Sequence, residues 1–140
     1  MIVSNADPFL EEAVQFAIAH PPCLIVVNTV LALHKVAERL KAHGTVYAIS
    51  GAVSSRERYR MILDWNGFPE NGAEEGNRFI VITRGILMAA GFTLQRYAHI
   101  ATTCCMTDYA ERQARGRFAF AKYVPTEHLI HTLPQQGRLL

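Results

Sequence analysis

The chain has 140 residues, 50% of them hydrophobic, and carries a formal net charge of +2 from 14 basic and 12 acidic residues. A chain of this length is expected to form one domain and to bury roughly 68–70% of its unfolded surface, so its core needs neither disulfides nor a metal ion. Because basic and acidic residues are nearly equal in number, the net charge alone does not indicate nucleic-acid binding.

Signals for export, membrane insertion and metal binding are missing from the sequence. The start, MIVSNADPF, has neither the basic nor the apolar region of a signal peptide, and no apolar run approaches the ~18 residues that cross a membrane. The three cysteines, with Cys104 and Cys105 adjacent, fit no disulfide framework, and no His/Cys spacing fits a zinc site. We therefore expect a cytoplasmic or otherwise intracellular protein that is not secreted, has no metal site of its own and binds no membrane.

The first half of the chain alternates between helical and extended patterns. Asp7 is a candidate N-cap and Pro8 suits a first helical turn, so we expect a helix up to the Pro21-Pro22 stop. The apolar run Cys23–Val27 is typical of a buried strand and ends at the polar pair Asn28-Thr29. A helix that Gly44 ends, a strand and a helix capped by Ser54 or Ser55 are then expected at residues 30–44, 45–49 and 55–66.

The second half contains two further apolar runs. Residues 67–77 form a loop by composition, and the β-branched run 78–83 predicts a strand that ends at Thr83-Arg84. We expect a loop next, then a strand over 98–103 and a helix capped by Thr107 or Asp108. This order predicts an α/β fold with a parallel sheet, in one domain over residues 1–140 with an N-terminal helix in 1–20 and a C-terminal extension in 125–140.

Two motifs at a fixed spacing carry a family resemblance. The segment T-R-x(5)-A-G-F-T-L begins at Thr83, and D-Y-x-x-R-Q-x-x-G-R follows from Asp108, one strand later. Together they resemble motifs V and VI of superfamily 2 helicases. The strand that ends at Asn28-Thr29 resembles motif IV, and the Ser-x-x-Glu-Arg stretch up to Arg58 resembles the element that follows the second strand. The resemblance covers about residues 20–122 and implies a RecA-like three-layer domain with a mostly parallel central sheet, the second of two such domains.

The resemblance also implies roles for particular residues. Arg117, with Gln113 and Gly116, is expected to face the γ-phosphate of ATP held by a first RecA-like domain, where an arginine finger accelerates hydrolysis by ~10³–10⁵. The alternative is that the arginines of this helix are surface charges on a solvated face. The residues expected to bind the backbone of single-stranded nucleic acid are Asn28, Thr29, Arg58, Thr83, Arg84 and Gly91.

The sequence departs from the family pattern in two places. Phe120 stands where motif VI usually has a second arginine, which puts hydrolysis in doubt or leaves it to Arg117. The chain has no G-x-x-x-x-G-K-[ST] loop and no Asp-Glu box, so it cannot be a complete helicase. We expect a fragment or a stand-alone second domain that uses ATP and Mg²⁺ only with a partner RecA-like domain, in cis or in trans, and that binds neither alone.

Three interpretations of function therefore remain. The first is the second RecA-like domain of an ATP-dependent helicase or translocase. The alternative is a non-catalytic regulatory module that keeps the fold and binds nucleic acid or protein. The third is a doubly wound domain without a nucleic-acid role. Ser54 and Ser55 have no His/Asp partners at a triad spacing, so nucleophilic catalysis is not expected.

Overall fold

The computed structural model describes residues 6–67, 77–89, 94 and 99–104. Strands and helices alternate along this part of the chain, as the apolar runs predicted. The elements are α1 (Leu10–Ala19), β1 (Cys23–Val27), α2 (Val30–Leu40) with the short 3₁₀ helix η1 (Lys41–His43), β2 (Gly44–Ile49), α3 (Ser55–Gly67), β3 (Asn77–Thr83), α4 (Arg84–Ala89) and β4 (His99–Thr102).

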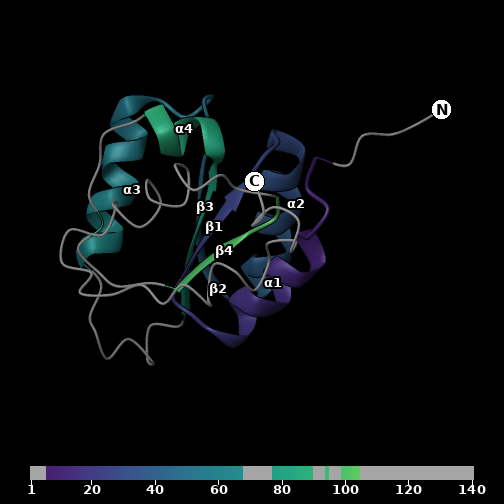
Figure 1. The fold of residues 1–140 in the computed structure, drawn as a ribbon. Coiled ribbons are helices and arrows are strands. Elements are labelled where there is room, and N and C mark those ends of the chain that lie inside the picture. The colour runs from purple at the N-terminus through teal and green to yellow at the C-terminus, as the bar shows by residue number, and fades with distance from the viewer. Residues whose placement is uncertain (1–5, 68–76, 90–93, 95–98, 105–140) are drawn as a thin grey trace.

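The four strands form one parallel sheet in the order β2-β3-β1-β4. Helices cover both faces: α1 and α2 lie on one side of the sheet, and α3 and α4 lie on the other (Figure 1). Because β1 is covered on both sides, all five of its side chains are buried. A strand in this position has a continuous apolar sequence rather than an alternating one. The predicted α/β fold with a parallel central sheet is confirmed.

The core consists of two apolar clusters, one on each face of the sheet. Side chains of β1 alternate between them: Leu24 and Val26 face α3 and α4, whereas Ile25 faces α1 and α2. Trp65 of α3 is fully buried in the first cluster.

The structure corrects two sequence-based predictions about local geometry. Asp7 does not cap α1, whose N-cap is Phe9 without any side-chain hydrogen bond. The residues after Thr83 do not form a loop, because α4 begins directly at Arg84 and buries Leu87 against the sheet. Ser54 does act as a cap, since its Oγ accepts a hydrogen bond of 3.1 Å from the amide of Glu57.

Gly44 is the C-cap of η1, in agreement with the predicted helix stop, and has a second role in the sheet. It is the first residue of β2, with a φ of 159°, and lies beside Asn77 at the start of β3. A Cβ at this position would lie 2.7 Å from the carbonyl carbon of Asn77 and closer still to its oxygen. Only glycine therefore allows the two strands to pair from their first residues.

Gly44→Ala is expected to lower the free energy of unfolding by roughly 2–3 kcal/mol, the cost of forcing a methyl group against backbone. Gly67→Ala is the matched control, because no atom lies within 4 Å of the position that a Cβ would take at Gly67. Urea unfolding of both variants measures the difference. Equal stability of the two would contradict the close approach of β2 and β3.

Several sequence-based predictions fall on residues outside the described part of the chain. These concern Gly91, the expected helix after Asp108 with Gln113, Gly116 and Arg117, Phe120, and the extension over 125–140. Within residues 6–67, 77–89, 94 and 99–104, every helix is too short or too polar to cross a bilayer. Cys23 and Cys104 are buried, and burial raises the pKa of the Cys23 thiol.

Candidate functional site

The strand order creates a switch point between β1 and β3. These strands are neighbours, with Val27 paired to Thr83 at their carboxyl ends. After β1 the chain enters α2 on one face of the sheet, and after β3 it enters α4 on the other. Such a divergence opens a crevice at the carboxyl edge of a parallel sheet, which is where ligands of open α/β folds bind.

The switch point brings together residues that are far apart in the sequence. Asn28 and Thr29 follow β1, and Thr83 and Arg84 end β3 and begin α4. Asn28, Thr29 and Arg84 are half-buried, while Thr83 is buried with 8% of its surface exposed. The structure therefore places these four predicted site residues at one edge of the sheet.

Arg58, the fifth predicted residue in the described part, lies in the first turns of α3. Its Nη2 is 3.5 Å from Oγ of Ser55. Because Ile49 at the end of β2 pairs with Ile82 of β3, α3 begins at the same edge as α2 and α4. Helix N-termini carry partial positive charge, so three of them at one edge favour an anionic ligand there.

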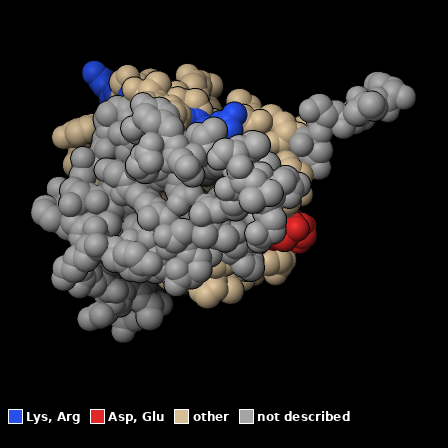
Figure 2. Space-filling model, viewed as in Figure 1, with Lys and Arg blue, Asp and Glu red and all other residues tan. Residues whose placement is uncertain are grey.

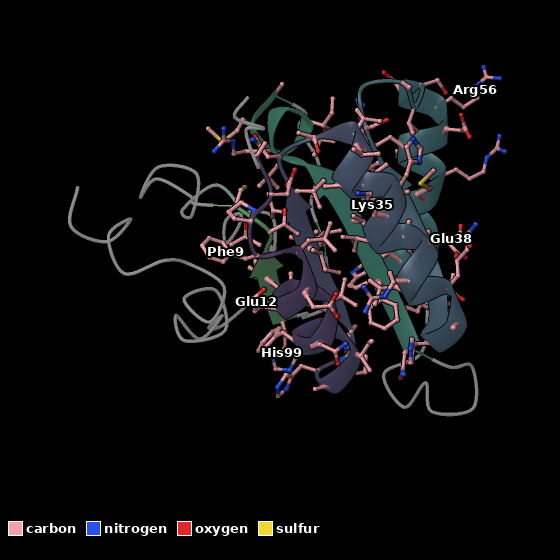
Figure 3. The ribbon with its side chains drawn as sticks, turned by 90° about the vertical axis from the view of Figure 1, so that its right-hand side faces the viewer. Phe9, Glu12, Lys35, Glu38, Arg56 and His99 are labelled. Carbon is pink, nitrogen blue, oxygen red and sulfur yellow. The ribbon has the colours of Figure 1, made fainter. Side chains whose placement is uncertain are left out.

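Basic side chains in view also gather at this edge. Figure 2 shows Lys and Arg side chains at the top of the molecule, where α3 and α4 begin in Figure 1, and acidic side chains at the side near α1. In Figure 3, Arg56 of α3 points away from the molecule at the same height, while His99, the first residue of β4, lies at the bottom. The described arginines near the carboxyl ends of the strands are Arg56, Arg58 and Arg84.

Asp7 is a site residue that the sequence analysis missed. Its carboxylate is buried and accepts three hydrogen bonds at the carboxyl edge. The backbone amide of Asn28 donates to Oδ1 at 2.7 Å, and the hydroxyl of Thr103 donates to the same oxygen at 2.6 Å. The hydroxyl of Thr29 donates to Oδ2 at 2.7 Å. Asp7 thus ties the segment before α1 to the ends of β1 and β4.

The hydroxyl of Thr29 both donates and accepts a hydrogen bond. Besides donating to Asp7, Oγ1 accepts a hydrogen bond of 3.0 Å from the amide of Ala32 and so caps α2. The side-chain amide of Asn28 donates to the carbonyl of Ala6 at 3.3 Å. The predicted backbone-binding pair after β1 is therefore engaged by residues 6 and 7.

Thr103, the last donor to Asp7, had a recognisable signal in the sequence. It is fully buried and follows β4, and its amide donates to the carbonyl of Val26 at 3.0 Å. A polar pair, Thr102-Thr103, ends this strand just as Asn28-Thr29 follows β1. The shared pattern of a polar pair at a strand end could have placed both pairs at one edge.

A second polar cluster lies away from the carboxyl edge. The hydroxyl of Tyr47 donates to Asp64 and accepts from Arg78, and Nη1 of Arg78 lies 3.2 Å from Oδ2 of Asp64. Burial, together with the hydrogen bond to Asp64, raises the pKa of Tyr47 to about 12. The cluster joins β2, β3 and α3 near the start of β3, so we assign it to stability rather than to the site.

The described residues offer no site for a resident metal ion. Among them, no three His, Cys, Asp or Glu side chains gather closely enough to hold one. The carboxylate oxygens of Asp7 accept hydrogen bonds from two hydroxyls and a backbone amide. Such donors bind an anion and not a cation. This donor set does not fit the magnesium ion that accompanies ATP.

No protein-family model and no curated protein sequence matches the chain. Solved structures do match. The C-terminal part of the Fun30 ATPase domain is 14% identical with a TM-score of 0.58, and the match covers 75% of this chain and 32% of that one. T4 UvsW is 18% identical with a TM-score of 0.52, and the match covers 86% of this chain and 23% of that one.

At these low sequence identities, the matches show a shared fold and do not show a shared function. The chain spans about a third of the first matched structure and about a quarter of the second. Both likenesses agree with the parallel sheet and its two helical layers. The protein thus shares its parallel α/β fold with the matched parts of the Fun30 ATPase domain and of T4 UvsW.

Proposed function

We propose that this chain is the second RecA-like domain of an ATP-dependent superfamily 2 helicase or translocase. The observation that supports it most is the meeting of Asn28-Thr29 with Thr83-Arg84 at the switch point. These pairs come from the segments that resemble motifs IV and V, and hydroxyl, amide and guanidinium donors are the groups that hold phosphodiester oxygens.

In this proposal nucleic acid lies along the carboxyl edge of the sheet. Arg84 and Arg58 supply charge to backbone phosphates, and Thr83 supplies a hydroxyl. Because these groups address the backbone, binding carries little sequence preference. Gly91 belongs to the same proposed contact through the resemblance.

The ATP site in this proposal belongs to two domains. A separate first RecA-like domain holds ATP and Mg²⁺, since this chain lacks the phosphate loop. Gln113, Gly116 and Arg117 complete the site from this side. Their role rests on the resemblance of motif VI.

A non-catalytic regulatory module is the second candidate. Phe120 in place of the second motif VI arginine favours it. In this case the fold and the backbone contacts persist, and hydrolysis is lost. The two candidates share the nucleic-acid edge and differ only at motif VI.

Arg84→Ala is expected to weaken binding of labelled single-stranded oligonucleotides about tenfold for all sequences, because it removes one charged hydrogen bond to phosphate. It should also flatten the dependence of log affinity on log salt by about 0.7, the value for one contact to a single strand. Fluorescence anisotropy at several salt concentrations measures both quantities.

The matched control is Lys41→Ala, which removes the same charge from the opposite edge. Lys41 lies in η1, just before β2, and is exposed. It should change affinity by less than about twofold, since an exposed charge more than a Debye length away is screened. Equal effects of the two variants, or binding that does not respond to salt, would argue against backbone contact at this edge.

A further inference from the structure

The donors at the carboxyl edge hold a carboxylate of the chain itself. We propose that Asp7 is an intramolecular latch: it competes with a nucleic-acid phosphate for the donors of Asn28, Thr29 and Thr103. In the closed state the segment 6–9 occupies part of the backbone site, and binding of a strand releases it. This inference rests on the proposed function and names a regulation of that same site.

The contacts of Asp7 have the chemistry of an anion site. A backbone amide and two hydroxyls donate to its two oxygens at 2.6–2.7 Å. The amide and one hydroxyl belong to residues 28 and 29, which precede the 11-residue helix α2. Backbone N–H groups and hydroxyls at a helix N-terminus are the donors that phosphate oxygens use in proteins. The carboxylate of Asp7 and the oxygens of a phosphate group therefore compete for the same donors.

The partners of Asp7 are distant in sequence, so the contact is not a local turn. They lie 21, 22 and 96 residues away along the chain. A cap or turn residue bonds within three or four residues. The carboxylate thus connects the ends of β1 and β4, at the edge of the sheet where the nucleic acid is proposed to lie.

The segment that carries Asp7 is held mainly by polar contacts, which include the Asp7 carboxylate and the carbonyl of Ala6. Asp7 is buried, whereas Ala6 and Phe9 are half-buried and Pro8 is exposed. The amide of Phe9 donates to the carbonyl of Thr103 at 2.9 Å, which holds the segment beside β4. A short segment with little buried apolar surface opens more readily than the core. Release of Asp7 therefore costs less than unfolding of the domain.

Only open molecules bind the nucleic acid, so the apparent affinity equals the intrinsic affinity multiplied by the fraction of molecules that are open. If it is closed in about nine molecules of ten, removing it raises affinity about tenfold. A purely supporting role makes the opposite prediction. If Asp7 only positions Asn28 and Thr29 for phosphate, its removal weakens binding. The sign of the change separates the two roles.

The experiment compares Asp7→Ala, Asp7→Asn and Glu12→Gln in the full chain. The probes are fluorescein-labelled oligothymidine and oligouridine single strands. Glu12, in the first turn of α1, is exposed and lies close to Phe9 in Figure 3, so its removal controls for the loss of one nearby negative charge. We expect about tenfold tighter binding for Asp7→Ala, a smaller gain for Asp7→Asn, and a change below about twofold for Glu12→Gln.

A second measurement does not depend on a variant that folds. Hydrogen exchange at the amide of Phe9 reports whether the segment stays on Thr103. Saturating the unmodified chain with oligothymidine is expected to speed this exchange at least several-fold. Unchanged exchange in the bound chain overturns the latch, even if Asp7→Ala does not fold.

The failures of the two proposals are distinguishable. Binding that Arg84→Ala weakens, but that Asp7→Ala leaves unchanged or weakens, overturns the latch and leaves the proposed function standing. Absence of salt-dependent binding in the unmodified chain and in the folded Asp7 variants overturns the proposed function. An equal gain from Glu12→Gln overturns the latch as well, because the effect is then one of general charge.

Discussion

Trp65→Ala is expected to lower the free energy of unfolding by about 3–5 kcal/mol, the usual cost of removing a large aromatic side chain from a core. Trp65 is fully buried, and its ring lies edge-on to that of Tyr47 at a centroid distance of 6.3 Å. It shares a cluster with Leu24 and Ile80 of the central strands. Ile62 and Trp65 are the buried residues of α3, so the substitution removes the larger of the two side chains that pack this helix against the sheet.

The measurement is urea unfolding followed by circular dichroism, because Trp65 is the only tryptophan and its fluorescence is lost with it. Tyr59→Ala on the same helix is the control. Tyr59 is 66% exposed, so its removal should change stability by no more than about 0.5 kcal/mol. Similar losses for both variants would mean that α3 does not pack on the sheet through this face.

The strands were predictable because burial on both faces leaves a signal within the strand itself. Cys23–Val27 is apolar at every position, and the structure begins and ends β1 at those residues. The last five residues of β3 are likewise buried. Helix α2 was predictable for a related reason, since its stripe of Leu33, Val36, Ala37 and Leu40 faces the sheet.

Features that depend on a distant partner were not predictable from local rules. Asp7 before Pro8 has the pattern of a helix cap, but its hydrogen-bond partners follow β1 and β4, which the sequence does not place beside it. Gly44 has the pattern of a helix stop and does end η1, but the backbone carbonyl of Asn77, which excludes a side chain there, belongs to a strand that local rules do not place beside it. Helix α4 has only six residues, with Gly85 in its second position, and so gives little periodic signal.

The candidate site was predictable in part for the same reason. Polar residues at the ends of apolar runs mark the carboxyl edge of a parallel sheet, and Asn28, Thr29, Thr83 and Arg84 all lie there. Which strands are neighbours is a matter of topology, and the order β2-β3-β1-β4 emerges only from the fold. Thr103 was therefore missed, although it ends a predicted strand.

Arg117→Ala is expected to slow ATP hydrolysis at least ~10³-fold when this chain is paired with a first RecA-like domain. The chain alone is expected to hydrolyse no ATP, because it lacks the phosphate loop. In the proposed site the guanidinium stabilises charge that develops on the γ-phosphate in the transition state. Arginine suits this role because it is always charged and presents a planar fork of donors.

The assay is steady-state phosphate release by the reconstituted pair with saturating single-stranded nucleic acid. Arg115→Ala on the same predicted helix is the control, because it removes an equal charge at a variable position of the Gln-x-x-Gly-Arg motif. Hydrolysis that is indifferent to Arg117→Ala, with the fold intact, would remove motif VI from the mechanism and favour the non-catalytic module.

Phe120→Arg then tests why the family's second arginine is missing. If the domain has lost catalysis through this position, restoring the arginine should raise a slow rate, because it supplies the second guanidinium that motif VI usually carries. If Phe120 instead contributes to the core, as the apolar run Phe118–Ala121 suggests, the substitution buries an unpaired charge and lowers the melting temperature. Melting curves recorded beside the rates separate these outcomes. A stable variant that is no faster means that the missing second arginine is not what limits hydrolysis.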